Sequence, residues 1–168
     1  MSEQPIYPRV GVACLLTSPD YPKSVLVGIR KGSHGAGKLA PPGGHVEMNE
    51  EWATTASREV AEETGLTIAE PAFHHIGTTN DPYIDARVDK HYITLFMYAR
   101  LEAGQAAEVQ LLEPNKCEGW KWMQWDNLIE LAESAPEKLF DPLLRFSKSD
   151  DGRRFVQLMN EEDECIIM

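Results

Sequence analysis

The sequence predicts an α/β fold in which strands and helices share one domain built on a mixed β-sheet. Segments rich in Val, Leu and Ile alternate along the chain with segments of helical character, and a glycine-rich loop leads into the longest predicted helix. The chain has 168 residues, of which 42% are hydrophobic and 26% charged. A length of this order suits one domain, and the composition excludes the disordered and fibrous classes of protein.

The first half of the chain predicts two strands, a loop and a helix. Val10–Leu16 and Ser24–Arg30 are apolar, and the turn residues between them predict that the two strands pair with each other. Lys31–Gly44 carries five glycines and two prolines, which predicts a loop. Glu50–Thr64 contains neither Pro nor Gly and is followed by Gly65, so it predicts a helix of about four turns.

The second half predicts three more strands and two more helices. The strands are expected at Phe73–Thr79, His91–Leu101 and Glu118–Trp125, and the helices at Asn127–Ser134 and Pro136–Ser147. We expect the folded domain to span residues 1–148 and residues 149–168 to form a polar, loosely ordered tail.

The charge of the chain argues against one large class of partner. Sixteen Lys and Arg residues against 27 Asp and Glu residues give a net charge of −11, whereas a general nucleic-acid-binding protein needs basic surface to neutralise phosphates. A small anionic substrate is still compatible with this charge if some of the acidic residues hold a divalent cation. The sequence therefore predicts a small-molecule ligand and no nucleic-acid partner.

The cysteines and the first residues of the chain indicate its compartment. Cys14, Cys117 and Cys165 are far apart and odd in number, which fits neither a disulfide framework nor a zinc site and favours a reducing environment. Met1–Arg9 has no apolar stretch of the signal-peptide type. The apolar runs elsewhere are far too short to span a membrane, so we expect a cytoplasmic or nuclear protein.

The last four residues carry a signal that would change this expectation. Cys165-Ile166-Ile167-Met168 matches the C-a-a-X pattern for farnesylation. The alternative is an accidental ending, since acidic residues at 161–164 stand where a basic second membrane signal would help. A single lipid chain anchors a protein only marginally, so farnesylation of Cys165 would predict weak membrane association.

The predicted helix at 50–64 carries carboxylates where an apolar face is expected. At 100° per residue, Trp52, Ala56 and Val60 fall on one arc, and Glu59 and Glu63 fall within or beside that arc. Carboxylates at a buried margin repel one another and lose solvation, so they need compensation. Mg²⁺ or Mn²⁺ with oxygen ligands would supply it. The alternative is a solvated cluster of glutamates, because Glu is a good helix former.

The spacing around this helix favours the metal site. Gly44, five residues, Glu50, seven residues and then Arg58-Glu59-Val60-Ala61-Glu62-Glu63-Thr64-Gly65-Leu66 match the pattern GX5EX7REUXEEXGU, in which U is apolar, at every fixed position. This pattern is the Nudix box, and the chain resembles a Nudix hydrolase. The resemblance implies a Nudix-type α/β/α sandwich with a central mixed β-sheet. It also implies Mg²⁺-assisted hydrolysis of a nucleoside diphosphate linked to another moiety.

The resemblance assigns roles to the residues of the box. It implies that Glu59 and Glu63 are the principal metal ligands and that the carbonyl of Gly44 is a further one. Glu62 would be either a third ligand or the group that orients the attacking water, and Arg58 would hold the carboxylates in position. Glu118, on the strand expected opposite, would be an outer ligand or a solvent-facing strand residue.

A wider resemblance covers about residues 8–146 and points to one MutT-like subgroup. It rests on the segments 30–37, 42–45, 91–94 and 113–120. Members of the subgroup hydrolyse purine nucleoside triphosphates, oxidised dGTP among them, and several are homodimers. By position, Arg30 would contact substrate phosphate, Thr94 would line the base pocket and Phe140 would stack on the base. The alternatives are a solvated strand end for Arg30 and ordinary core positions for Thr94 and Phe140.

Three positions depart from the subgroup. Pro41 stands where Leu is usual and stiffens the loop before the box, and Asn49 replaces a common Gly, with little expected consequence. Asp141 follows Phe140 where these relatives commonly carry Trp. The loss of that aromatic side chain and the gain of an acceptor for purine N–H groups make Asp141 a candidate substrate-binding residue that would alter base specificity.

The resemblance thus implies a Mg²⁺-dependent homodimeric enzyme that hydrolyses purine nucleoside triphosphates to the monophosphate and pyrophosphate. An isoprenoid diphosphate or a nucleotide sugar is the alternative substrate, because the box handles only the pyrophosphate. The alternative of another class is a catalytically idle module that binds a nucleotide or a partner. The intact set Glu59, Glu62 and Glu63 argues against this last interpretation, since a binding module needs no such set.

Overall fold

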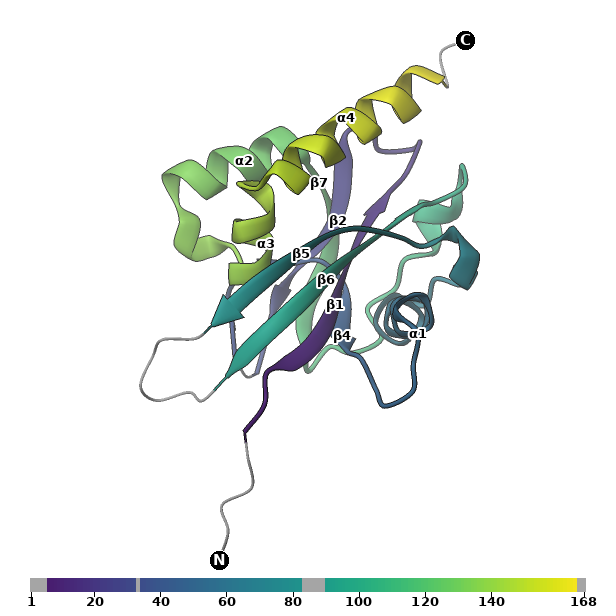
Figure 1. Cartoon of the computed structure of the whole chain (residues 1–168). Helices are drawn as coiled ribbons and strands as arrows, with labels where there is room; N and C mark the ends of the chain where they lie inside the picture. The colour runs from purple at the N-terminus through teal and green to yellow at the C-terminus, as the bar shows by residue number, and fades with distance from the viewer. Residues whose placement is uncertain (1–5, 33, 83–89, 166–168) are drawn as a thin grey trace, which may run out of the picture.

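The strands of the molecule form two sheets (Figure 1). The computed structural model describes residues 6–32, 34–82 and 90–165. The first sheet has the order β4-β1-β6-β5, and the second has the order β3-β2-β7. All five strands that the sequence predicts are present, and two short strands, β3 and β4, lie in the predicted loop. The bounds are β1 (Arg9–Thr17), β2 (Ser24–Arg30), β3 (Leu39–Ala40), β4 (Gly43–His45), β5 (His74–Pro82), β6 (His91–Arg100) and β7 (Cys117–Gln124).

The two strands β1 and β2 do not pair with each other, so the predicted pairing is wrong. β1 pairs in parallel with β6, in the register Arg9↔Tyr92 to Thr17↔Arg100, and antiparallel with β4. β2 pairs antiparallel with β3 and β7. Every residue of β1 from Gly11 onward is buried, which is typical of a strand covered on both faces. With β4 and β6 on its two edges, β1 has no edge left for β2.

Helices cover both faces of the strands (Figure 1). On one side lies α1 (Trp52–Thr64), and on the other lie α2 (Trp125–Ser134), α3 (Asp141–Ser147) and α4 (Asp150–Cys165). Short 3₁₀ turns connect the elements: η1 (Glu70–Ala72), η2 (Gln105–Glu108) and η3 (Pro136–Lys138). This arrangement confirms the predicted α/β fold with α/β/α layers and a mixed sheet.

A core lies on each side of the strands, because successive residues of a strand point to opposite faces. Val12, Cys14 and Leu16 of β1 pack on the α1 side with Ala56 and Val60. Ala13 and Leu15 of the same strand point to the other side, where they join the core formed with the remaining helices. The alternating contributions of β1 therefore fix the position of α1 relative to α2, α3 and α4.

The helix α1 begins and ends close to the predicted residues. It ends at Gly65, whose φ of 75° is left-handed and whose N–H donates to the carbonyl of Ala61, as a glycine at this position allows. Ala56 and Val60 are fully buried, as the helical wheel indicates. The placement of Trp52 on the buried arc is wrong, because Trp52 is the first residue of the helix and is 45% exposed, with its ring beside that of His75.

The predicted helix at 136–147 is divided into η3 and α3. Between them, Leu139 and Phe140 have extended backbone, and the N–H of Phe140 donates to the carbonyl of Leu39 in β3. Pro142 in the first turn of α3 suits a helix start, because proline has no N–H and the N–H groups of a first turn have no acceptor within the helix. The division places Phe140 at the entrance of α3 rather than within a helix.

The expectation of a loosely ordered tail after residue 148 is wrong, because residues 150–165 form α4. Phe155 and Met159, four residues apart, lie on one helical face and are buried in the core. Arg100 of β6 forms ion pairs with Glu162 and Asp163 near the end of the helix. Cys165 is exposed, whereas Ile166, Ile167 and Met168 of the C-a-a-X pattern lie outside the described residues. Within the ranges described, no helix has the length and apolar character that crossing a membrane requires.

Candidate active site

A cavity of about 450 Å³ lies between α1, the N-terminus of α3 and strands of both sheets. Its lining contains three kinds of side chain, contributed by segments far apart in the sequence. We call Glu59, Glu63 and Glu113 the acidic wall, and Tyr92, Thr94 and Phe140 the ring wall. The cations that line the same cavity are Arg9, Arg30, Lys31, Lys90 and Lys116.

The acidic wall depends on two glycines of β4. A Cβ on Gly43 would lie 2.1 Å from the carbonyl oxygen of Val12, so a side chain there would separate β4 from β1. A Cβ on Gly44 would lie 2.2 Å from the carboxyl group of Glu59. The N–H of Gly43 donates to the Glu63 carboxylate at 3.3 Å. The loop backbone before α1 thus lies directly against the two carboxylates that the helix presents.

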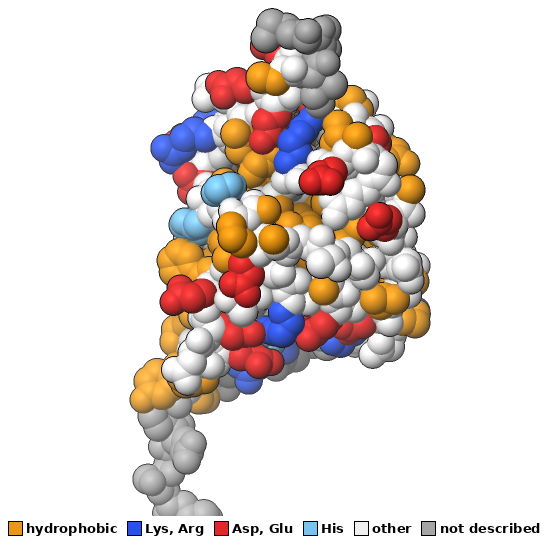
Figure 2. Space-filling model, turned by 90° about the vertical axis from the view of Figure 1, so that its right-hand side faces the viewer, with side chains coloured by type: hydrophobic (Ala, Val, Ile, Leu, Met, Phe, Trp, Pro, Cys, Tyr) orange, Lys and Arg blue, Asp and Glu red, His pale blue; other side chains and the backbone are white. Residues whose placement is uncertain are grey.

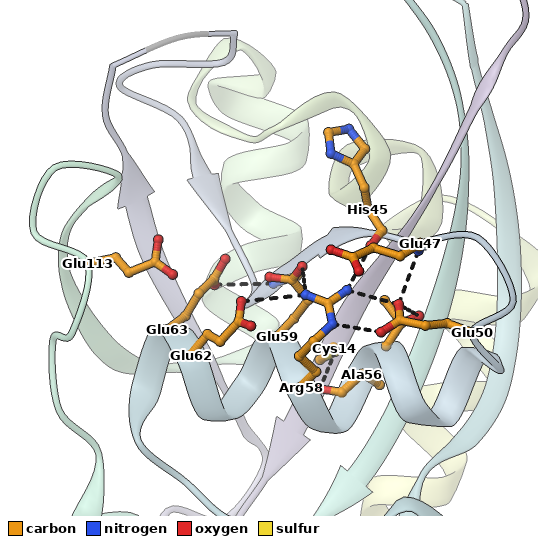
Figure 3. A network of polar contacts seen from close by, with 12 residues as sticks. Cys14, His45, Glu47, Glu50, Ala56, Arg58, Glu59, Glu62, Glu63 and Glu113 are labelled. Carbon is orange, nitrogen blue, oxygen red and sulfur yellow. Dashed lines mark hydrogen bonds and ion pairs between the residues drawn. The ribbon is translucent and has the colours of Figure 1, made fainter.

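Arg58 is the only guanidinium that the described contacts place among these carboxylates (Figure 3). Its Nε and Nη2 donate to the two oxygens of Glu50 at 2.8 and 2.9 Å, and its Nη1 donates to Glu59 at 2.8 Å. Glu62 lies farther from it, at 3.5 Å. A second bond from Nη2 reaches the carbonyl of His45 at 3.1 Å and joins α1 to β4. Arg58 therefore bonds to Glu59, Glu50 and the backbone of β4 at once.

The carboxyl groups of α1 differ in their pKa values because their surroundings differ. Hydrogen bonds from Arg58 and from the Glu47 N–H lower the pKa of Glu50 to about 2. Burial, together with the charge of Glu59, raises the pKa of Glu63 to about 8. Burial also raises the pKa of Glu59, although the bond from Arg58 opposes the rise. Burial therefore disfavours the charged form of both groups, and only Glu59 has an ion pair among the described residues to oppose it.

Glu113 faces these groups from the loop before β7 and was not predicted (Figure 3). The negative charge of Glu113 contributes to the rise in the pKa of Glu63. Lys116 forms an ion pair with Glu113. Glu118, which the sequence offered as an outer ligand, is exposed and is not among the lining residues. The segment at 113–120 signalled a family resemblance, but no local pattern gave Glu113 a role.

The acidic character extends to the outer surface on the α1 side. Figure 2, which looks at this side of the molecule, shows acidic side chains gathered around basic ones along the lower edge of the folded body. Glu62 belongs to the exposed part of this set, with a side chain that is 51% exposed. It does not line the cavity itself. Glu62 therefore stands where water has free access to it.

The donor set fits a hard divalent cation. Carboxylate oxygens are the ligands that Mg²⁺ prefers, and the lack of a Cβ on Gly44 leaves its backbone open beside Glu59. As the side chains stand, no three His, Cys, Asp or Glu residues in the described ranges converge on one point. Arg58 holds one oxygen of Glu59 in an ion pair. Glu59, Glu63 and the Gly44 backbone are the groups that would hold the ion.

Arg30 is the lining cation that contacts the ring wall. Its Nε donates to the carbonyl of His34 at 3.1 Å, and its guanidinium carbon lies 4.2 Å from the centre of the Phe140 ring. A cation over the face of an aromatic ring is attracted by the ring quadrupole. These contacts hold the Arg30 guanidinium on the cavity wall.

The ring wall carries two aromatic rings and two hydroxyls, those of Tyr92 and Thr94. Tyr92 stacks on His45 with 5.5 Å between ring centres, and Phe140 meets the edge of His34 at 5.7 Å. Thr94, two residues after Tyr92 on the same face of β6, is buried and lines the cavity. Aromatic side chains pack well against flat ring systems, and here His45 and His34 stack on Tyr92 while Arg30 lies over Phe140.

Two acidic residues near the ring wall differ from expectation. Asp141 does not line the cavity, and its carboxylate instead forms an ion pair with Lys38 at 3.2 Å. Asp81 of β5, which the sequence analysis did not single out, is buried and accepts hydrogen bonds from Thr79 and Thr94. Burial raises the pKa of Asp81, and the two hydroxyl bonds oppose the rise. The pairing of β5 with β6 brings these three residues together.

Known proteins resemble this chain in sequence and in fold. The NUDIX domain profile matches residues 7–143. An oxidized purine nucleoside triphosphate hydrolase from Danio rerio is 30% identical over 125 residues, which cover 73% of this chain and 72% of that protein. A MutT NUDIX hydrolase from Burkholderia pseudomallei, 26% identical, has a TM-score of 0.61 with coverage of 72% of this chain and 86% of its own. The NUDIX domain of Shewanella oneidensis NrtR has a TM-score of 0.66 over 90% of both chains and, at 19% identity, indicates the fold alone.

Proposed function

The chain belongs to the NUDIX family and is a Nudix hydrolase, and from this premise we propose that it hydrolyses purine nucleoside triphosphates, oxidised ones included, to the monophosphate and pyrophosphate. We propose Mg²⁺ as its cofactor, with Mn²⁺ as a substitute. The relative from Danio rerio, named for the hydrolysis of oxidized purine nucleoside triphosphates, supports this substrate class.

One observation carries the proposal: carboxylates, cations and aromatic faces line a single cavity. A nucleoside triphosphate has the matching parts, because its phosphates need cations and its base needs a flat apolar surface. An isoprenoid diphosphate has no flat ring system to match the aromatic residues that line this cavity. A module that only binds a nucleotide has no need of the buried carboxylates of Glu59 and Glu63.

The chemistry assigns separate tasks to the chain's own residues. When bound, the divalent cation would neutralise the pyrophosphate and lower the pKa of its coordinated water. Glu59 and Glu63 would hold it, Arg58 would keep Glu59 in position, and Glu62, exposed beside them, would orient or deprotonate the attacking water. Arg30 and Lys116 would bind phosphate oxygens, and the ring wall would hold the base.

The test is the release of monophosphate and pyrophosphate from a panel of compounds in the presence of Mg²⁺. The panel holds normal and oxidised purine and pyrimidine triphosphates, nucleotide sugars and geranyl diphosphate. We expect purine triphosphates to give the highest kcat/KM, with monophosphate and pyrophosphate in equal amounts. Activity confined to nucleotide sugars or to geranyl diphosphate would overturn the substrate class, and no hydrolysis of any compound would leave the binding module as the better description.

The homodimer and the farnesyl group stay predictions. We propose a homodimer because of the subgroup resemblance, which sedimentation of the pure protein tests directly. We also propose that Cys165, exposed at the end of α4, accepts a farnesyl group. Incubation of the full chain with a farnesyltransferase and farnesyl diphosphate, followed by mass measurement, tests it, with Cys165→Ser as the control.

A further inference from the structure

Asp81 is a buried carboxyl group that touches the cavity only through another side chain. It is 1% exposed and is not among the lining residues, whereas Thr94 is. Thr79 and Thr94 are opposite each other in the register of β5 and β6, and Asp81 follows two residues after Thr79 on the same face. The three side chains therefore form a compact polar group in a largely apolar layer.

Both threonine hydroxyls donate to the same oxygen of Asp81. Thr79 Oγ1 lies 2.8 Å and Thr94 Oγ1 lies 2.9 Å from Asp81 Oδ2. The other oxygen, Oδ1, accepts no hydrogen bond from the described residues, and Arg145 Nε lies 3.5 Å from it. A threonine hydroxyl has one hydrogen and two lone pairs. Because Asp81 takes the hydrogen of Thr94, only lone pairs of that hydroxyl remain for a ligand in the cavity.

We propose that Asp81 is a positioning residue that determines ring specificity: it fixes Thr94 as a pure hydrogen-bond acceptor, so that the cavity selects rings that present an N–H donor at this point. The inference rests on the proposed function and deepens it. A ring with a lone pair facing Thr94 would leave two acceptors opposed in a buried place, which costs more than a missing contact.

The test compares ligands that differ in their N–H groups. Inosine and adenosine nucleotides carry a ring N–H or an amino group, whereas purine riboside nucleotides carry neither. Direct binding of the three monophosphates is measured by calorimetry, and hydrolysis of the three triphosphates is measured in parallel. We expect the wild-type protein to bind purine riboside monophosphate about tenfold more weakly than the better of the other two.

Four variants separate the proposed role from a merely structural one. Asp81→Leu removes the acceptor and frees the Thr94 hydrogen, so the tenfold penalty should fall to about twofold or less while kcat changes little. Asp81→Asn keeps an oxygen that can accept both hydroxyls, so it should retain the penalty. Thr79→Val is the matched control, because it removes the other hydroxyl and leaves the Thr94–Asp81 bond. Asp81→Ala replaces Asp81→Leu if circular dichroism shows that the leucine variant does not fold.

The outcomes distinguish the two proposals. A penalty that disappears in Asp81→Leu and persists in Asp81→Asn and Thr79→Val supports the role of Asp81. An unchanged penalty in a folded Asp81→Leu or Asp81→Ala, or equal losses for all three ligands, overturns it. Selective binding of monophosphates without hydrolysis of any triphosphate would overturn the proposed function and support the role of Asp81, whereas binding of none of them would overturn that role.

Discussion

The buried carboxyl groups at the acidic wall and next to the ring wall have different surroundings. At the acidic wall, Glu59, Glu63 and Glu113 are brought together, and burial raises the pKa of Glu63 to about 8. Behind Thr94 of the ring wall, Asp81 is buried, two hydroxyls of its own sheet donate to it, and Arg145 lies 3.5 Å from its other oxygen. The first arrangement leaves Glu63 without an ion pair among the described residues, and in the second one oxygen of Asp81 is satisfied by neighbours in the fold.

The difference indicates which part of the function depends on an external ion. Buried carboxylates without a cation are unfavourable, so the acidic wall gains most from a bound metal. The ring wall needs no such partner, because its hydroxyls and aromatic faces are already held by β5, β6 and α3. We therefore expect changes at the acidic wall to lower kcat, and changes at the ring wall to alter KM and the choice of base.

The largest expected effect is that of Glu63→Gln, which removes one charge from the acidic wall. The variant keeps the shape of the side chain and the hydrogen bond from Gly43. We expect kcat to fall about 10³-fold, because the metal ion that stabilises the negative charge of the transition state loses a carboxylate ligand. Steady-state kinetics at saturating Mg²⁺ measures it. Glu133→Gln on α2, exposed and outside the cavity, is the matched control and should stay within about twofold. A Glu63→Gln variant with normal kcat and raised KM would break the comparison.

A smaller loss is expected from Arg58→Lys. Lysine keeps the positive charge but cannot donate to Glu50 and Glu59 in the fork geometry of a guanidinium. Because Arg58 positions a ligand rather than being one, kcat/KM should fall about 10- to 100-fold. A titration with Mn²⁺ followed by calorimetry should show weaker metal binding in the same variant. Unchanged metal affinity with reduced kcat/KM would instead indicate that Arg58 contacts the substrate.

Phe140→Ala tests the other wall and should act mainly on KM. Loss of the ring face removes stacking on the base, and KM should rise about tenfold while kcat stays within about threefold. Phe140→Leu, which keeps the apolar bulk without the flat face, should recover little of the loss. A large fall in kcat in Phe140→Ala, with KM unaffected, would show that the two walls do not divide the function in this way.

The acidic wall was largely predictable because Gly44, Glu59 and Glu63 lie in one loop and one helix. Helical periodicity and motif spacing act over such short distances. Glu113 could not be found in this way, because it comes from a loop before β7 and meets Glu63 only in the folded chain. The ring wall followed mainly from a family resemblance, and Asp81 was missed because its role depends on the register between β5 and β6.

The fold shows the same limit. Strand and helix positions were predictable from local composition, but the partners of β1 were not, since a parallel neighbour such as β6 is distant in sequence. The helix α4 was missed because its fully buried apolar side chains, Phe155 and Met159, stand in a segment rich in charge. Likewise, Asp141 follows Phe140 in sequence, yet the start of α3 directs it to Lys38.

The smallest expected effect concerns the stability of the fold at the ring wall. Burial raises the pKa of Asp81 in the folded protein above its value in the unfolded chain, near 3.9. Between the two pKa values the folded state binds more protons, so the contribution of Asp81 to stability falls as the pH rises through this window. Asp81→Asn has no such dependence and keeps an acceptor for both hydroxyls. In urea unfolding from pH 4 to pH 7, the variant should gain stability relative to the wild type as the pH rises. A difference that moves in the other direction would mean that Arg145 stabilises the ionised carboxylate, and that the ring wall, like the acidic wall, depends on a cation.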